Sequence, residues 1–189
     1  MTKPLATPSE TAGEFSPRVP DGDNRDRLVC DTCGFINYVN PKVIVGAVCT
    51  WEDKLLLCRR SIQPRSGYWT IPAGFMEEQE STAEGAAREA KEEALADIEL
   101  DGILAIYDIP RLSQVQIIYR ARMLNDNYGV GEESAEVELF HWDDIPWDDL
   151  AFPTIHWSLN QYYETRHGPL GAPFTTPDHA HHHVRSGNP

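Results

Sequence analysis

Two continuous apolar runs follow one another in the middle of the chain, and they restrict the fold more than any other feature. Residues 43–51 read VIVGAVCTW and residues 54–60 read KLLLCRR, with Glu52 and Asp53 between them. Both runs have the length of strands, and neither alternates between apolar and polar positions. They therefore predict two adjacent strands of a sheet that is covered on both faces.

The remaining elements follow from periodicity and from turn residues. A short strand is expected at residues 69–71, and longer strands are expected at residues 97–108, 114–124 and 137–142. Helices are expected at residues 81–94 and 153–166. Strands before and after a helix, followed by a strand pair and a closing helix, predict an α/β sandwich, with too few helices for a doubly wound sheet.

The helix at residues 81–94 carries the strongest chemical signal. Ser81 and Glu84 have the spacing of a capping box, which marks the start of the helix. On a helical wheel, small alanines form a narrow apolar stripe that would pack closely on a sheet. Next to this stripe, Glu89, Glu92 and Glu93 share one arc at positions i, i+3 and i+4.

Three carboxylates on one arc repel one another, and each like-charge pair destabilises a helix by a few tenths of a kcal/mol. A divalent cation would offset this repulsion, because hard cations bind several oxygen ligands. Gly85 would leave room for a ligand above the carboxylates. The alternative is a solvated acidic face neutralised in part by Arg88 and Lys91, and the spacing alone leaves both readings open.

The same segment resembles the Nudix box, G-x5-E-x7-R-E-U-x-E-E-x-G-U, where U is aliphatic. The matching positions are Gly74, Glu80, Arg88, Glu89, Ala90, Glu92 and Glu93. Leu95 departs from the pattern, because the family usually has glycine there, so we expect the helix to run on or to turn differently at this point. WTIPAGF before the box and ESAEVELFHWDDIPW after it also resemble the family, and the similarity covers about residues 40–165.

This resemblance implies a Nudix-type α/β/α sandwich with a mixed β-sheet, and a hydrolase that cuts a pyrophosphate bond in a small nucleotide. The sequence is most similar to bacterial and plastid-type members that act on ADP-ribose or FAD. A nucleoside triphosphate pyrophosphohydrolase and a non-catalytic nucleotide sensor remain as alternatives. Carried over by position, Mg²⁺ or Mn²⁺ would be bound by Gly74, through its carbonyl, and by Glu89, Glu92 and Glu93, while Arg88 would pair with Glu80.

The general base is not fixed by the box. The candidates are Glu93, Glu133 and Glu136, and Glu133 lies in a Gly-containing segment that could close over a substrate. An ordinary loop carboxylate is the alternative for Glu133. For substrate binding the candidates are Arg59, Tyr68, Trp69 and Phe75. Core packing is the alternative for the aromatic residues, and of the pair Arg59-Arg60 one is expected to be a plain surface charge.

The predicted organisation has four parts. Residues 1–26 are expected to form a disordered arm, residues 27–40 a degenerate zinc ribbon, residues 41–166 the Nudix domain, and residues 167–189 an irregular tail that contains HAHHH. Cys30 and Cys33 form a CxxC, but residues 1–29 supply no second pair of Cys or His, so zinc binding is not expected. Cys49 and Cys58 are expected to be buried apolar residues.

The net charge of −14 disfavours nucleic acid and anionic membranes as partners. No apolar stretch approaches the roughly 20 residues that span a bilayer, and the N-terminal residues lack the apolar core of a secretory signal. A cytoplasmic location is therefore expected. The resemblance also implies a possible homodimer.

Overall fold

The computed structural model describes residues 13–178, and the chain divides after Asn40 into two compact units. Residues 1–12 of the predicted arm and residues 179–189, which include the HAHHH segment, lie outside the described residues.

The first unit is a small antiparallel sheet of β1 (Phe15–Arg18), β2 (Arg27–Cys30) and β3 (Ile36–Asn37), in that order. This corrects the prediction of a disordered arm up to residue 26, because β1 pairs with β2 from Phe15↔Cys30 to Arg18↔Arg27. Asp23 accepts a hydrogen bond from Arg27 Nε at 2.8 Å in the connection between these strands. Backbone pairing of this kind leaves no apolar period in the sequence.

The second unit contains an eight-stranded mixed sheet. Along its main path, β4 lies parallel to β9 and β11 lies parallel to β8, whereas the other neighbouring strands are antiparallel. The order of strands on this path is β10 (Ser134–His141), β5 (Lys54–Arg60), β4 (Lys42–Trp51), β9 (Gln114–Met123), β8 (Ile98–Ile109) and β11 (Phe174–Thr175).

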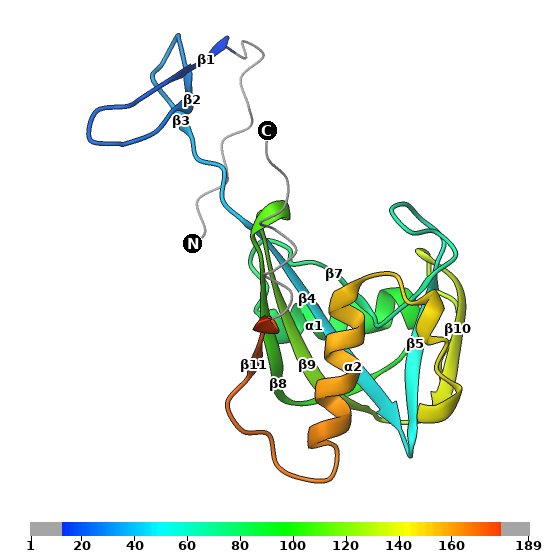
Figure 1. The fold of residues 1–189 in the computed structure, drawn as a ribbon. Coiled ribbons are helices and arrows are strands. Elements are labelled where there is room, and N and C mark those ends of the chain that lie inside the picture. The colour runs from blue at the N-terminus through cyan, green and yellow to red at the C-terminus, as the bar shows by residue number, and fades with distance from the viewer. Residues whose placement is uncertain (1–12, 179–189) are drawn as a thin grey trace, which may run out of the picture. The chain divides into compact units, whose positions relative to one another are not determined.

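Two helices cover opposite faces of this sheet (Figure 1). Helix α1 (Thr82–Ala94) packs its alanine stripe, including Ala86 and Ala90, on one face, and helix α2 (Pro153–Thr165) packs Ile155 and Leu159 on the other. The two core clusters explain why the central strands are apolar throughout. The predicted α/β/α sandwich with a mixed sheet is confirmed.

Strands β4 and β5 are paired only next to their connecting turn, at Thr50↔Leu55 and Trp51↔Lys54. Beyond these pairs the two strands take different partners. The short strand β6 (Trp69–Thr70) pairs with β5, and β7 (Ala73–Phe75) pairs with β4. The segment that leads into α1 is thereby built into the sheet, which fixes Gly74 relative to the helix that follows.

Helix α1 begins with the predicted capping box, in which Ser81 and Glu84 satisfy each other's backbone N–H groups. It ends at Ala94, and Leu95 adopts the left-handed conformation with φ 54° and ψ 15°. The expectation that the helix would run on or turn differently is therefore wrong. Hydrogen bonds offset the cost of about 1–2 kcal/mol for a left-handed leucine: Leu95 N–H donates to Lys91 O at 3.0 Å, and Gly129 N–H donates to Ala94 O at 2.8 Å.

The segment after α2 is not wholly irregular, which corrects the prediction for residues 167–178. Strand β11 extends the sheet through the pairs Phe174↔Ala105 and Thr175↔Ile106. Two residues of strand give no periodic signal in a sequence. Short 3₁₀ helices occur at Pro110–Leu112, Trp142–Asp144 and Trp147–Asp149. Among the described residues, no helix is long and apolar enough to cross a membrane.

Candidate active site

One large cavity of about 1460 Å³ collects most of the sequence-predicted site residues. Its walls come from β7, the exposed arc of α1, the segment before β10, strand β9 and the start of α2. The predicted residues that line it are Gly74, Phe75, Arg88, Glu89, Glu92, Glu93 and Glu133. Local helix geometry brings the three α1 carboxylates together, and the pairing of β7 with β4 brings Gly74 to them.

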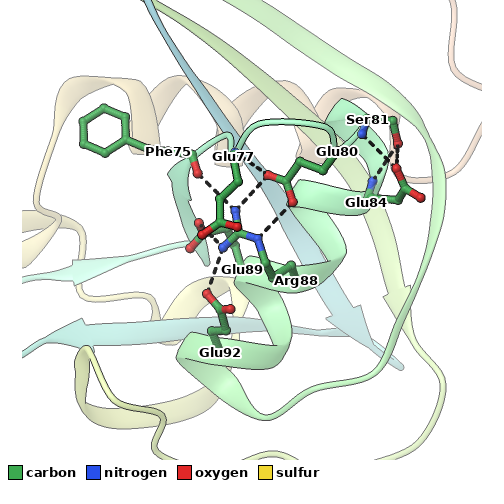
Figure 2. A network of polar contacts seen from close by, with 8 residues as sticks. All are labelled: Phe75, Glu77, Glu80, Ser81, Glu84, Arg88, Glu89 and Glu92. Carbon is green, nitrogen blue, oxygen red and sulfur yellow. Dashed lines mark hydrogen bonds and ion pairs between the residues drawn. The ribbon is translucent and has the colours of Figure 1, made fainter. Parts of the chain in front are cut away.

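Arg88 is the centre of a hydrogen-bond network on α1, as Figure 2 shows. Its guanidinium forms a two-pronged pair with Glu80, through Nε–Oε2 and Nη2–Oε1, both at 3.0 Å. Nη1 donates to Glu89 Oε1 and to Glu92 Oε2, each at 2.8 Å, and Nη2 donates to the carbonyl of Phe75 at 3.0 Å. These bonds raise the pKa of Arg88 and lower that of Glu80. Arg88 therefore fixes the positions of two neighbouring carboxylates.

Gly74 is required by the position of Glu89. A Cβ added at Gly74 would lie 2.4 Å from Oε1 and 2.5 Å from Oε2 of Glu89, so any side chain there would displace the carboxylate. Glu89 itself is only 7% exposed. Burial raises its pKa, and the charges of Glu92 and Glu133 act in the same direction against the hydrogen bond from Arg88.

Glu93 is the most deeply placed carboxylate of the helix, at 5% exposure. Its Oε2 accepts a hydrogen bond from the backbone N–H of Ala73 at 3.0 Å. Burial raises the pKa of Glu93 to about 7, and the charges of Glu89 and Glu133 raise it as well, whereas Arg60 lowers it. Two buried carboxylates, Glu89 and Glu93, thus lie in the same cavity lining as the exposed Glu92 and Glu133, and Arg88 and Arg60 supply the nearby positive charge.

The donor atoms at this end of the cavity suit a hard divalent cation, since they are carboxylate oxygens together with the nearby Gly74 carbonyl. As the side chains stand, no three acidic, histidine or cysteine side chains among residues 13–178 are arranged to hold a metal ion. Arg88 Nη1 donates to one oxygen each of Glu89 and Glu92. The residues fit a metal by the chemistry of their donor atoms.

The segment that carries Glu133 is fastened to the end of α1. Gly131 N–H donates to Glu93 O at 3.1 Å, and a Cβ at Gly131 would lie 1.7 Å from Glu92 O. Gly129 adds the bond to Ala94 O. The segment that was expected to close over a substrate is therefore attached, in this structure, to the helix that carries the other carboxylates.

Four predicted residues lie outside the cavity lining. Arg59 donates a hydrogen bond to Gly67 O at 2.8 Å. It also pairs with Glu136 at 3.2 Å, so the charged side chains of these two predicted residues contact each other. Trp69 is 7% exposed and packs edge to face on Phe140, so the core-packing alternative describes it. The ring of Tyr68 lies under the guanidinium of Arg65.

Several cavity residues were missed by the sequence reasoning, notably Arg60, Gln114, Gln116 and Trp157. Arg60 was weighed only as an alternative to Arg59. The sequence could not show which of Arg59 and Arg60 faces the cavity. Strand β5 is buried on both faces, so it has no alternation of apolar and polar residues that would identify the cavity side. The two glutamines do stand out as polar residues two apart in the otherwise apolar start of β9, and that signal was overlooked.

Comparison with known proteins gives matches along most of the chain. A family model described as "NUDIX domain" matches residues 40–163. A second model, a zinc ribbon described as "Nudix N-terminal", matches residues 11–39. The second match begins well before residue 27, where the ribbon was predicted to begin, and agrees with the inclusion of β1 in the first unit. Zinc binding by Cys30 and Cys33 stays untested.

Among solved structures, a Nudix hydrolase from Nitrosomonas europaea is 45% identical, with a TM-score of 0.82 over 91% of this chain and 99% of that chain. An ADP-ribose pyrophosphatase from Methanocaldococcus jannaschii is 29% identical over 61% of this chain and 69% of its own length. The Nudix domain of Shewanella oneidensis NrtR, solved with ADP-ribose, is 25% identical, with a TM-score of 0.57 over 67% of this chain and 89% of that chain.

Proposed function

The chain belongs to the Nudix hydrolase family, and from this premise we propose that it uses Mg²⁺ or Mn²⁺ to hydrolyse the pyrophosphate bond of a nucleoside diphosphate linked to a second group, such as ADP-ribose or FAD. The products would be two monophosphates. The observation that carries the proposal is the meeting of Glu89, Glu92, Glu93 and Glu133 at one end of a single large cavity.

The metal would be held by the Gly74 carbonyl and by the carboxylates of Glu89, Glu92 and Glu93. When bound, it neutralises phosphate charge, polarises a phosphoryl oxygen and lowers the pKa of a water molecule. Arg88 positions Glu89 through Nη1 and is itself positioned by Glu80, so its role is to orient the ligands.

For the general base, Glu133 is the better supported of the three candidates. Glu136 is paired with Arg59 outside the cavity, and Glu93 is committed to Ala73 N–H and to the proposed metal. Glu133 lines the cavity, and its charge acts on both Glu89 and Glu93. In this proposal a Glu133 carboxylate oxygen accepts the proton of the attacking water.

The substrate is proposed to be a small two-part nucleotide. A volume of about 1460 Å³ exceeds the roughly 300–1,000 Å³ of ordinary ligand pockets, so the cavity has room for groups on both sides of a diphosphate. Arg60 lies in the lining and lowers the pKa of Glu93, which supports a contact between Arg60 and a phosphate of the substrate. Phe75 is 52% exposed in the same lining and offers an apolar surface.

The test is a panel of ADP-ribose, FAD and nucleoside triphosphates with Mg²⁺ or Mn²⁺, with the products identified by mass. Two monophosphates from ADP-ribose or FAD, and loss of turnover in EDTA, are expected. Release of inorganic pyrophosphate from triphosphates would instead favour the triphosphate alternative. Intact substrates throughout the panel would refute the proposed activity.

The predicted homodimer can be checked separately by light scattering at several protein concentrations. A mass of twice 21.3 kDa is expected. A monomer at every concentration would contradict the dimer without affecting the proposed chemistry.

A further inference from the structure

Part of the cavity lining comes from strand β9 and differs in chemical character from the lining that α1 supplies. Gln114 and Gln116 lie two residues apart on β9, so both side chains point to one face of the sheet, followed by Ile118. This is the face covered by α2, because Ile118 belongs to the core cluster that contains Ile155 and Leu159. Gln116 is paired in register with Ile44 of β4, which also lines the cavity.

Near these amides the lining is mostly apolar and contains an aromatic ring, and Arg111, three residues before Gln114, lines the cavity as well. Ile44, Ile109 and Trp157 all line the cavity. The indole of Trp157 packs edge to face on the fully buried Tyr107, with 5.4 Å between the ring centroids. Trp157 is thereby held by the core on one side while it lines the cavity on the other.

The two amides are free to bind a ligand. No side-chain hydrogen bond within residues 13–178 engages the amide of Gln114 or of Gln116. A carboxamide offers two donor hydrogens and one acceptor oxygen, so it can match a ligand edge that alternates donors and acceptors. Polar groups that line an apolar cavity in small number determine how a ligand is oriented and which ligand is selected.

We propose that Gln114, Gln116 and Trp157 form a subsite for the flat heteroaromatic ring of the nucleotide substrate, with the two amides recognising the edge of the ring. Apolar side chains with two unengaged amides fit a planar ring that carries nitrogen and oxygen atoms on its rim. A bare sugar fits the apolar part of this lining poorly, because it would lose hydration without enough polar partners. The inference rests on the proposed function, since it assigns the diphosphate to the acidic end of the same cavity.

The experiment measures binding without hydrolysis. AMP carries an aromatic ring but has no pyrophosphate bond, and ribose 5-phosphate lacks the ring. Isothermal titration in Mg²⁺ compares both ligands on the wild type and on the variants Gln114→Leu and Gln116→Leu, which keep the approximate side-chain volume. Asn160→Leu is the control, because it exchanges an amide for an apolar side chain at an exposed position of α2 that does not line the cavity. Thermal unfolding of each variant checks that the fold is retained.

Wild-type protein is expected to bind AMP at least about tenfold more tightly than ribose 5-phosphate. Each glutamine variant should weaken AMP binding by about threefold to tenfold, as expected for a lost hydrogen bond, and leave ribose 5-phosphate binding unchanged. Asn160→Leu should match the wild type. A third variant, Trp157→Leu, should also weaken AMP selectively.

Equal affinity for the two ligands, or variants that weaken both ligands alike or neither, would overturn the subsite. These outcomes differ from a failure of the proposed function, in which the wild type cleaves no substrate in the panel. AMP selectivity that depends on the glutamines would still identify a ring-binding subsite in that case.

Discussion

The backbone N–H of Gly131 donates a hydrogen bond to the carbonyl oxygen of Glu93 at 3.1 Å, so the segment that carries one proposed catalytic carboxylate is attached to the residue that carries another. The contact is too close for any side chain at position 131, since a Cβ would lie 1.7 Å from Glu92 O. The helix end and the segment before β10 therefore act as one positioned unit.

Replacing Gly131 by alanine tests this attachment. The clash is with backbone, which cannot rotate away, so we expect the free energy of unfolding to fall by about 1–3 kcal/mol. Turnover should also fall, because Glu133 would move relative to the helix. Gly171→Ala is the matched control, since nothing lies within 4 Å of a Cβ at that position. Denaturant unfolding and steady-state kinetics measure both effects, and equal behaviour of the two variants would contradict the positioning role.

The neighbouring arginines of β5 provide a second matched pair. Arg60 lines the cavity, where its Nε donates to Pro64 O at 2.9 Å and its guanidinium lies over the ring of Phe152, whereas Arg59 lies outside the lining and pairs with Glu136. Arg60→Gln should raise KM by about tenfold or more, as expected for a lost charge-assisted contact with phosphate. Arg59→Gln should leave KM within about twofold of the wild type. Kinetics with ADP-ribose decide the matter, and the reverse pattern would restore the original assignment of Arg59.

The metal-binding proposal predicts a separation of turnover from folding. Glu92→Gln and Glu93→Gln keep the size of the side chain but remove a negative ligand, so kcat should fall at least about 100-fold. Glu138→Gln on the exposed side of β10 is the control and should have wild-type kcat. The variants should also lose most of the increase in thermal unfolding temperature that Mn²⁺ gives the wild type. Wild-type kcat in either variant would count against the mechanism.

The Glu80–Arg88 pair predicts how stability depends on pH. Hydrogen bonds from Arg88 hold the pKa of Glu80 below its ordinary value of 4.5. A carboxyl with a lowered pKa in the folded state stabilises the protein fully above about pH 4.5, and this contribution is lost as the pH falls through the lower folded-state pKa. Glu80→Gln should therefore lower the unfolding temperature at pH 6 and approach the wild type near pH 3.

Thermal unfolding of wild type and Glu80→Gln at a series of pH values measures this difference. Glu78→Gln, at an exposed neighbouring position, should show no difference that varies with pH in this range. A Glu80→Gln effect of constant size from pH 6 to pH 3 would show that the ionised pair is not its source.

The helix and its carboxylates could be predicted because their signals are local. Ser81 and Glu84 fix the start of α1 within one turn, and the i, i+3, i+4 spacing places Glu89, Glu92 and Glu93 on one arc whatever the rest of the chain does. The continuous apolar runs, the periodicity and the turn residues likewise predicted the main strands. The helix was predicted to end at Ala94, as it does, but the left-handed conformation of Leu95 was not predicted, and the bond from Gly129 to Ala94 O comes from 35 positions further along the chain.

What the sequence by itself determined is therefore the capped helix with its arc of carboxylates, the class of fold and the family. The tertiary structure alone decided which of Arg59 and Arg60 lines the cavity, that Glu133 and not Glu136 lines it, and that two glutamines of β9 belong to the same lining. The physical reason is that helix geometry repeats over a few residues, whereas the cavity is built by strand pairings between distant segments, and strands buried on both faces carry no alternation that reveals their orientation.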